Sequence, residues 1–358
     1  MRAEPLPGHP LTGRHLSGGD AQRRLRLALG LSVSTLLLLL AGLAAGSDGW
    51  SPLQLLQTWS GPDGALIVGH IRAPRTLGAW LTGALLGLAG ATAQGLFRNP
   101  LADPFLLGSA SGASLGVVLV LAAGALGGHA ISPIIGFDMA DALLRFGLVG
   151  AAFVGALLGV LLTLSLARGA QQTTRLLLAG VVVGVVLSAF GDLVTTAAPD
   201  ALRGKQAFLL GSTGFLGWSS CAALAIGLVL TLPPSWRLAR ALDALTLGVD
   251  SARSLGLALP RVRLALVAAL ALATGLAVSQ AGLIAFVGLA APHLVRRFAP
   301  ATHGFTLVAS SAAGGTLLLL ADVLARCLIA PQEVPVGVLT ALLGGGYLIW
   351  LLRRRRFS

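Results

Sequence analysis

Long apolar runs limit what this chain can fold into more than any other feature of its sequence. Of the 358 residues, 55% are hydrophobic and only 11% are charged, whereas soluble domains carry about 25% charged residues. A soluble fold could not remove this much apolar surface from water, so lipid must be the solvent for much of it. The composition therefore predicts an all-α polytopic membrane protein.

Charged residues, prolines and clusters of glycine with polar residues divide the chain into ten apolar segments. Most are roughly 20 residues long, the length at which a helix spans a bilayer. The expected spans are 27–46, 75–96, 106–124, 145–167, 176–197, 208–231, 263–281, 283–296, 305–326 and 336–352. We expect a transmembrane domain at 27–352, a polar tail at 1–26 and a basic tail at 353–358. The first apolar run is long enough to remain as a helix, so we expect no cleaved signal peptide.

The positions of the basic residues predict which side of the membrane each loop faces, because cytoplasmic loops are enriched in Lys and Arg. With both termini in the cytoplasm, 19 of the 25 basic residues fall inside and six fall outside. Those outside are Arg72, Arg75, Arg145, Arg203, Lys205 and Arg326. We therefore expect both termini to be cytoplasmic. The net charge of +12 reflects these loops rather than a nucleic-acid surface, because the arginines lie between apolar runs.

Signatures of catalysis are missing from the sequence. The phosphate-binding loop G-x-x-x-x-G-K-[ST] does not fit, because the only lysine, Lys205, is followed by Gln206. The six histidines are scattered without metal-ligand spacing. We expect no ATP hydrolysis on this chain, no metal site and no permanently bound cofactor.

A few charged residues fall within or near the spans, where charge is costly and points to function. Asp322 and Arg326 lie four residues apart, close enough to pair on one helix. Asp192 lies toward the outer end of the fifth span. Simple solvation at a helix end is an equal alternative for these residues. The glycine series Gly83, Gly87 and Gly90 favours close helix packing rather than ligand binding.

The longest polar stretch within the membrane region runs from about 233 to 262. It is too polar to span the bilayer and too short to form a domain. Leucines alternate there with Arg240, Asp243, Asp250 and Arg253, which indicates short amphipathic helices on the cytoplasmic side. The pattern alone fits a docking surface for a partner and a solvated connector equally well.

Several ordered strings resemble one family of transporters. They are Ile71-Arg-Ala-Pro-Arg-Thr76, Arg98-Asn-Pro-Leu-Ala-Asp-Pro104, Gly282-Leu-Ile-Ala-Phe-Val-Gly-Leu289, Pro292-His293, Ala321-Asp322 and Glu333-Val-Pro-Val-Gly337. The chain resembles the FecCD-type permeases over about residues 25–352. These are the membrane subunits of ABC importers for siderophores, haem and vitamin B12.

This resemblance implies a type II ABC importer permease, a homodimer with about ten transmembrane helices per subunit. It implies two copies of a cytoplasmic ATPase, which would use the ATP, and a periplasmic substrate-binding protein. In the family, arginines on the outer face meet acidic residues of the binding protein. The matching residues are Arg72, Arg75 and Arg326.

The resemblance also implies positions for coupling, gating and transport. The coupling region for the ATPase matches Leu247, Gly248, Ser254, Leu255 and Gly256. The cytoplasmic gate matches Thr173 and Thr174, ahead of the fifth span. That span would line the pathway with an apolar face that includes Val181, Val185 and Phe190.

The substrate is the least constrained part of this interpretation. We expect an iron chelate, with haem slightly favoured over a ferric siderophore on the Gln94-Gly-Leu-Phe-Arg-Asn99 region, and cobalamin as the alternative. The sequence departs from the family pattern near Phe208-Leu-Leu-Gly-Ser-Thr213, so the resemblance does not define the outer part of the pathway. An ion-coupled secondary transporter would need more buried carboxylates, and a membrane enzyme would need a polar catalytic cluster.

Overall fold

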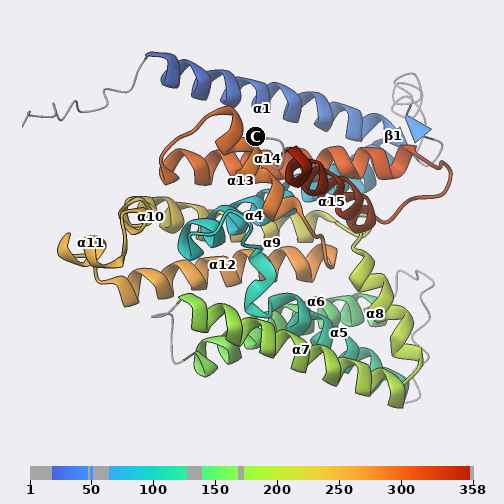
Figure 1. The fold of residues 1–358 in the computed structure, drawn as a ribbon. Helices are drawn as coiled ribbons and strands as arrows, with labels where there is room; N and C mark the ends of the chain where they lie inside the picture. The colour runs from blue at the N-terminus through green and yellow to red at the C-terminus, as the bar shows by residue number, and fades with distance from the viewer. Residues whose placement is uncertain (1–17, 47–48, 51–63, 127–138, 168–172, 355–358) are drawn as a thin grey trace, which may run out of the picture.

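The computed structural model describes residues 18–46, 49–50, 64–126, 139–167 and 173–354, which form a bundle of helices (Figure 1). Ten helices correspond in order to the ten predicted spans. They are α1 (Gly18–Ala44), α4 (Ala73–Phe97), α5 (Ser109–Leu126), α6 (Met139–Leu166), α7 (Thr173–Ala197), α9 (Trp218–Arg237), α12 (Leu259–Ala281), α13 (Val287–Phe298), α14 (His303–Cys327) and α15 (Val336–Arg354).

Shorter elements connect the long helices. They are α3 (Gly64–Leu66), the π-helix η1 (Ile67–Arg72), the 3-10 helix η2 (Pro104–Leu107), α8 (Asp200–Leu210), α10 (Ala239–Thr246) and α11 (Val249–Ser254). A two-residue antiparallel pair, β1 (Ala45–Gly46) and β2 (Gly49–Trp50), follows α1, with Ala45 opposite Trp50.

Seven helices in the described part of the chain are long and apolar enough to cross a bilayer. They cover Gly19–Ala44, Ile67–Phe97, Phe146–Leu166, Thr173–Ala197, Trp218–Arg237, Leu259–Ala281 and His303–Cys327. Ser109–Ala125 and Val336–Tyr347 are shorter apolar helices. Helix α13 has 12 residues, or about 18 Å at 1.5 Å per residue, and is too short to cross a bilayer alone. The prediction of an all-α polytopic membrane protein is confirmed.

The prediction of one span at 208–231 is wrong in its first half. Phe208 belongs to the end of α8, and the membrane helix α9 begins only at Trp218. Gly211 ends α8 with φ +64°, a conformation that glycine adopts without steric cost. The apolar composition around Phe208 concealed this break, because hydropathy alone does not register backbone turns. The expected polar tail 1–26 is also partly helical, since α1 begins at Gly18.

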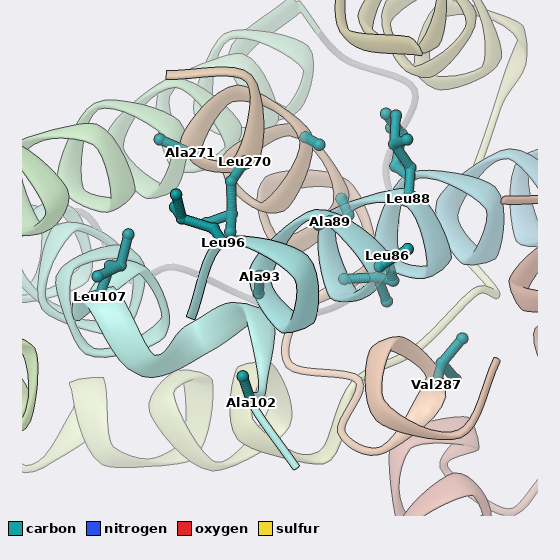
Figure 2. Close-up of a cluster of buried hydrophobic side chains, with 14 of the residues drawn as sticks. Leu86, Leu88, Ala89, Ala93, Leu96, Ala102, Leu107, Leu270, Ala271 and Val287 are labelled. Carbon is teal, nitrogen blue, oxygen red and sulfur yellow. The ribbon is translucent and has the colours of Figure 1, made fainter. Parts of the chain in front are cut away.

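Helix α4 forms the centre of the bundle and is almost wholly buried. Its side chains Leu86, Leu88 and Leu96 pack in one cluster with residues of α12 and α13, as Figure 2 shows. Burial on nearly all sides explains why α4 has no clear polar face, in contrast to a helix at a water-exposed surface.

Glycines bring the backbones of neighbouring helices into direct contact. A Cβ at Gly83 or Gly87 would collide with backbone atoms of α14, and a Cβ at Gly90 would collide with α13. Gly112 of α5 and Gly155 of α6 approach each other in the same way. This confirms that Gly83, Gly87 and Gly90 serve close packing, which membrane helices need because lipid supplies no hydrophobic drive between them.

The short helices mark opposite ends of the bundle. In Figure 1, α10 and α11 project at one end and α8 lies at the other. Helix α14 joins the two ends, because its first residue, His303, contacts α10 and its last turn contacts the loop after α8. These two ends carry most of the candidate functional residues.

Candidate functional site

A buried carboxylate, Asp322, organises the charged groups at the C-terminal end of α14. Its side chain has no exposed surface, and it accepts hydrogen bonds from Thr213 Oγ1 at 2.5 Å and Arg75 Nε at 3.2 Å. It also pairs with Arg326, which confirms that these residues interact across one helical turn. Two arginines and a hydroxyl therefore compensate the charge that burial would otherwise make costly.

Arg75 has a second carboxylate partner on the loop that precedes α15. Its Nη1 and Nη2 donate to Glu333 Oε1 and Oε2 at 2.7 and 2.9 Å, a two-pronged arrangement. Charge-assisted pairs of this geometry are among the stronger protein hydrogen bonds. The hydrogen bond from Arg75 holds the pKa of Glu333 below its usual range, and this effect outweighs the partial burial of the carboxyl. Sequence analysis missed this pair, because 258 positions separate the residues.

The three expected docking arginines differ in their access to solvent. Arg326 is only 3% exposed and donates to the carbonyl of Gly42 at 2.9 Å as well as to Asp322. Arg72 is half-buried and donates to the carbonyl of Leu43 at 3.1 Å. The structure brings Arg75 and Arg326 together on Asp322, but it does not present Arg326 on the surface. In this conformation Arg326 is buried too deeply to contact a partner directly.

The expected coupling residues lie at the opposite end of the bundle, in and around α11. Leu247 ends α10 and is 70% exposed, and Leu255 ends α11 and is 64% exposed. Gly248 and Gly256 have φ +110° and +78°, so the turns on either side of α11 need residues without a Cβ. Ser254 is also exposed. On their inner faces, α10 and α11 are packed against the bundle through buried residues such as Leu242 and Ala252. The exposed side chains of Leu247 and Leu255 therefore project from helices that are anchored in the protein.

A carboxylate of α10 caps the start of α14. Asp243 Oδ1 accepts from the backbone N–H of His303 at 2.9 Å and lies 2.7 Å from His303 Nδ1. Helix N-termini leave unpaired N–H groups and a partial positive charge, so a carboxylate is stabilising there. The ring of His303 also packs close to Gly95 at the end of α4. The expected coupling region is thus attached to two long helices, a link that sequence spacing did not indicate.

An open groove of about 640 Å³ runs along α7 against η2 and α5. Of the three residues predicted to line the pathway, Val181 and Val185 line this groove, whereas Phe190 is exposed but lies outside the lining. Its polar groups include Ser111 and Ser188, whose hydroxyls are 3.1 Å apart. Asp192 lies at the groove and pairs with Lys205 of α8.

The expected gate residues lie at the start of helix α7. Thr173 is its first residue and half-buried, and Thr174 is exposed. Residues 168–172 before them lie outside the described part of the chain. The structure therefore places the two hydroxyls at the start of α7, the helix that also lines the groove.

Comparison with known proteins gives this arrangement its context. Residues 34–354 match the model of the FecCD transport family. The vitamin B12 import system permease protein BtuC of Escherichia coli O17:K52:H18 (strain UMN026) is 39% identical over 338 residues, which cover 94% of this chain and 98% of that protein. The BtuC protein of Shigella boydii serotype 18 is 38% identical over 342 residues, covering 95% and 99% of the two chains.

A solved structure supports the same assignment. An inward-facing conformation of a metal-chelate type ABC transporter aligns with a TM-score of 0.76 and 26% identity, covering 92% of this chain and 99% of that chain. The family match over residues 34–354 includes the groove, the charged cluster on α14 and the helices α10 and α11. This chain is a multi-pass membrane permease of an ABC importer, and it belongs to the FecCD transport family.

Proposed function

We propose that this chain imports cobalamin, vitamin B12, as the membrane subunit of an ABC importer. The observation that carries the proposal is the 38–39% identity to BtuC permeases over nearly the whole of both chains. These relatives favour the cobalamin alternative over the iron chelate that the sequence strings suggested. The metal-chelate type transporter is compatible with it, because cobalamin is itself a chelated metal.

The groove along α7 supports a bulky, already chelated substrate. Its walls are mostly apolar, with hydroxyl and carboxylate groups at only a few points. A bare metal ion would need oxygen, nitrogen or sulfur ligands to replace its water. A wall built mainly of glycine and apolar side chains, with few polar groups, suits a large organic ligand that must pass without being held tightly.

The partners proposed are a second copy of this chain, two copies of an ATPase and a substrate-binding protein. The exposed tips Leu247 and Leu255 would contact the ATPase on the cytoplasmic side, and the face around Arg72 and Arg75 would receive acidic residues of the binding protein. Arg326 would stabilise this face from the interior through its contacts with Asp322 and the carbonyl of Gly42. Thr173 and Thr174 would close the pathway inside. The protein would lie in the bacterial inner membrane with both termini cytoplasmic.

Transport in proteoliposomes tests the proposal. The chain is purified with the ATPase and binding protein of the same import system and offered cobalamin, haem and a ferric siderophore in parallel, each with and without ATP. We expect ATP-dependent uptake of cobalamin alone. Uptake of haem or the siderophore instead would restore the iron-chelate interpretation, and uptake driven by an ion gradient without ATP would exclude an ABC importer.

A further inference from the structure

The guanidinium that is proposed to receive the binding protein is already occupied. Arg75 gives its Nε to Asp322 and both terminal nitrogens to Glu333. The side chain of Arg75 keeps only 13% of its surface exposed, whereas that of Glu333 keeps 44%. A carboxylate that arrives from outside therefore meets Glu333 at the position it would itself take on Arg75.

We infer that Glu333 is an internal competitor for Arg75, and that the partner surface which fits this face presents a carboxylate that displaces it. The inference rests on the proposed docking role of this face and adds the residue that opposes docking. Exchange, rather than addition, follows from the geometry. A two-pronged contact needs Nη1 and Nη2 together, and Glu333 uses both.

The two carboxylates on Arg75 differ in how easily they can leave. Asp322 is fully buried and is also held by Thr213 and Arg326, so its removal would strand a buried charge. Glu333 is partly exposed on a loop, so water can solvate its carboxylate after it leaves Arg75, and no buried charge is stranded. When another carboxylate replaces Glu333, the number of ion pairs on Arg75 stays the same, so the exchange costs little free energy. Arg75 stays anchored through Nε while its outer edge changes partner.

The competitor also affects selectivity. While Glu333 is in place, Arg75 does not offer a free guanidinium edge to other anions, such as phosphate groups of lipids. Only a surface that supplies further contacts around Arg75 makes the exchange favourable, because specificity often depends on a cost that wrong partners cannot repay.

Displacement of Glu333 would act on the helix that follows it. The loop is tied to α14 by the hydrogen bond from Val334 N to Ala325 O at 3.1 Å, and α15 begins at Val336. Gly337 lies directly against the backbone of Leu210 at the end of α8 and of Leu283 between α12 and α13. Docking at Arg75 is thereby connected, within four residues of chain, to the junction of three helices.

A binding measurement tests the inference, with the permease–ATPase complex in lipid nanodiscs and the purified binding protein of the same import system. We expect Glu333→Gln to tighten docking about three- to tenfold, because the neutral amide competes weakly for the guanidinium. A purely structural role of Glu333 predicts the opposite sign. Asp200→Asn is the matched control, since it removes one exposed negative charge at the start of α8 on the same side; its affinity should change less than about twofold.

A double substitution separates exchange from general charge attraction. In the Arg75→Gln background, Glu333→Gln should give no gain, because the contested group is gone. Unchanged or weaker docking of Glu333→Gln, or the same gain with and without Arg75, would overturn the inference. Failure of the unaltered complex to bind the protein at all would instead remove the proposed docking function, and with it the competitor. Melting temperatures of all variants check that they are folded.

Discussion

At the scale of single residues, the charged cluster at the end of α14 combines groups of very different burial. Asp322 and Arg326 are within the protein, and Glu333 is the exposed outer member. The spacing of four residues predicted the Asp322–Arg326 pair, because one helical turn places both side chains on one face. No local rule indicates that Arg75 joins them from a helix 247 positions away. Sequence spacing therefore predicts contacts between residues one helical turn apart, but not contacts between residues of distant helices.

Acid should weaken the Arg75–Glu333 pair. The pKa of Glu333 is lower in the folded protein than in the unfolded chain, so the pair contributes stability above the usual glutamate range and loses it as the pH falls through the lowered value. At neutral pH we expect the unaltered protein to have a slightly higher melting temperature than Glu333→Gln. The difference in the free energy of unfolding should be at most about 1 kcal/mol, because Glu333 is partly exposed. The difference should vanish in strong acid. A difference independent of pH would contradict it.

At the scale of helices, the contact between α4 and α14 depends on residues without side chains. Sequence spacing predicted that Gly83, Gly87 and Gly90 would pack closely, because small residues at one-turn intervals form a flat helix face. It could not predict which helix would occupy that face. The break between α8 and α9 also escaped prediction, because it depends on the backbone conformation of Gly211 in an otherwise apolar run.

Gly87→Ala should separate α4 from α14. The added Cβ would collide with the backbone of Ser310, and a backbone cannot move aside as a flexible side chain can. We expect a loss of about 1–3 kcal/mol, the usual cost of overpacking a well-packed contact. Gly150→Ala on α6 is the control, because a Cβ there meets nothing within 4 Å. Thermal unfolding in detergent compares the two, and equal melting temperatures would show that the contact yields easily.

The cap on α14 should connect the coupling region to transport. We expect Asp243→Ala to cost about 1 kcal/mol of stability and to lower uptake per ATP hydrolysed, because α10 loses its attachment to His303. Asp243→Asn keeps an acceptor oxygen and should recover part of the uptake. Asp250→Ala, an almost fully exposed neighbour in α11, serves as the control. Unaltered uptake per ATP in Asp243→Ala would limit the cap to a structural role.

At the scale of the whole molecule, the ten apolar segments of the sequence match ten helices in the same order, and seven helices in the described part of the chain are long and apolar enough to cross a bilayer. Length and hydropathy suffice for this, because a bilayer requires about 20 apolar residues per span. The length criterion nonetheless fails for α13, whose 12 residues are counted as a span only through their place in the order. The cobalamin substrate proposed here was not the one favoured by the sequence, because a mostly apolar groove is compatible with many chelates.

Leu255 should matter to assembly and not to folding. Its side chain is 64% exposed at the end of α11, so Leu255→Asp removes little from the core. We expect the variant to melt like the unaltered protein but to lose most of the ATPase on co-purification, because a charge would be buried in the contact. Leu255→Ile keeps the apolar tip and should retain the ATPase. Full retention by the Asp variant would place the contact elsewhere.

Helix α14 has 25 residues and is about 37 Å long at 1.5 Å per residue, with the cap of Asp243 at its first residue and Asp322 near its other end. A helix packed along its length against α4 transmits displacement rather than absorbing it. If both partners dock at its two ends, the thermodynamics must be reciprocal. Whatever factor ATP applies to the affinity for the binding protein, the binding protein applies to the affinity for ATP, so nucleotide titrations alone would reveal what happens on the far side of the membrane.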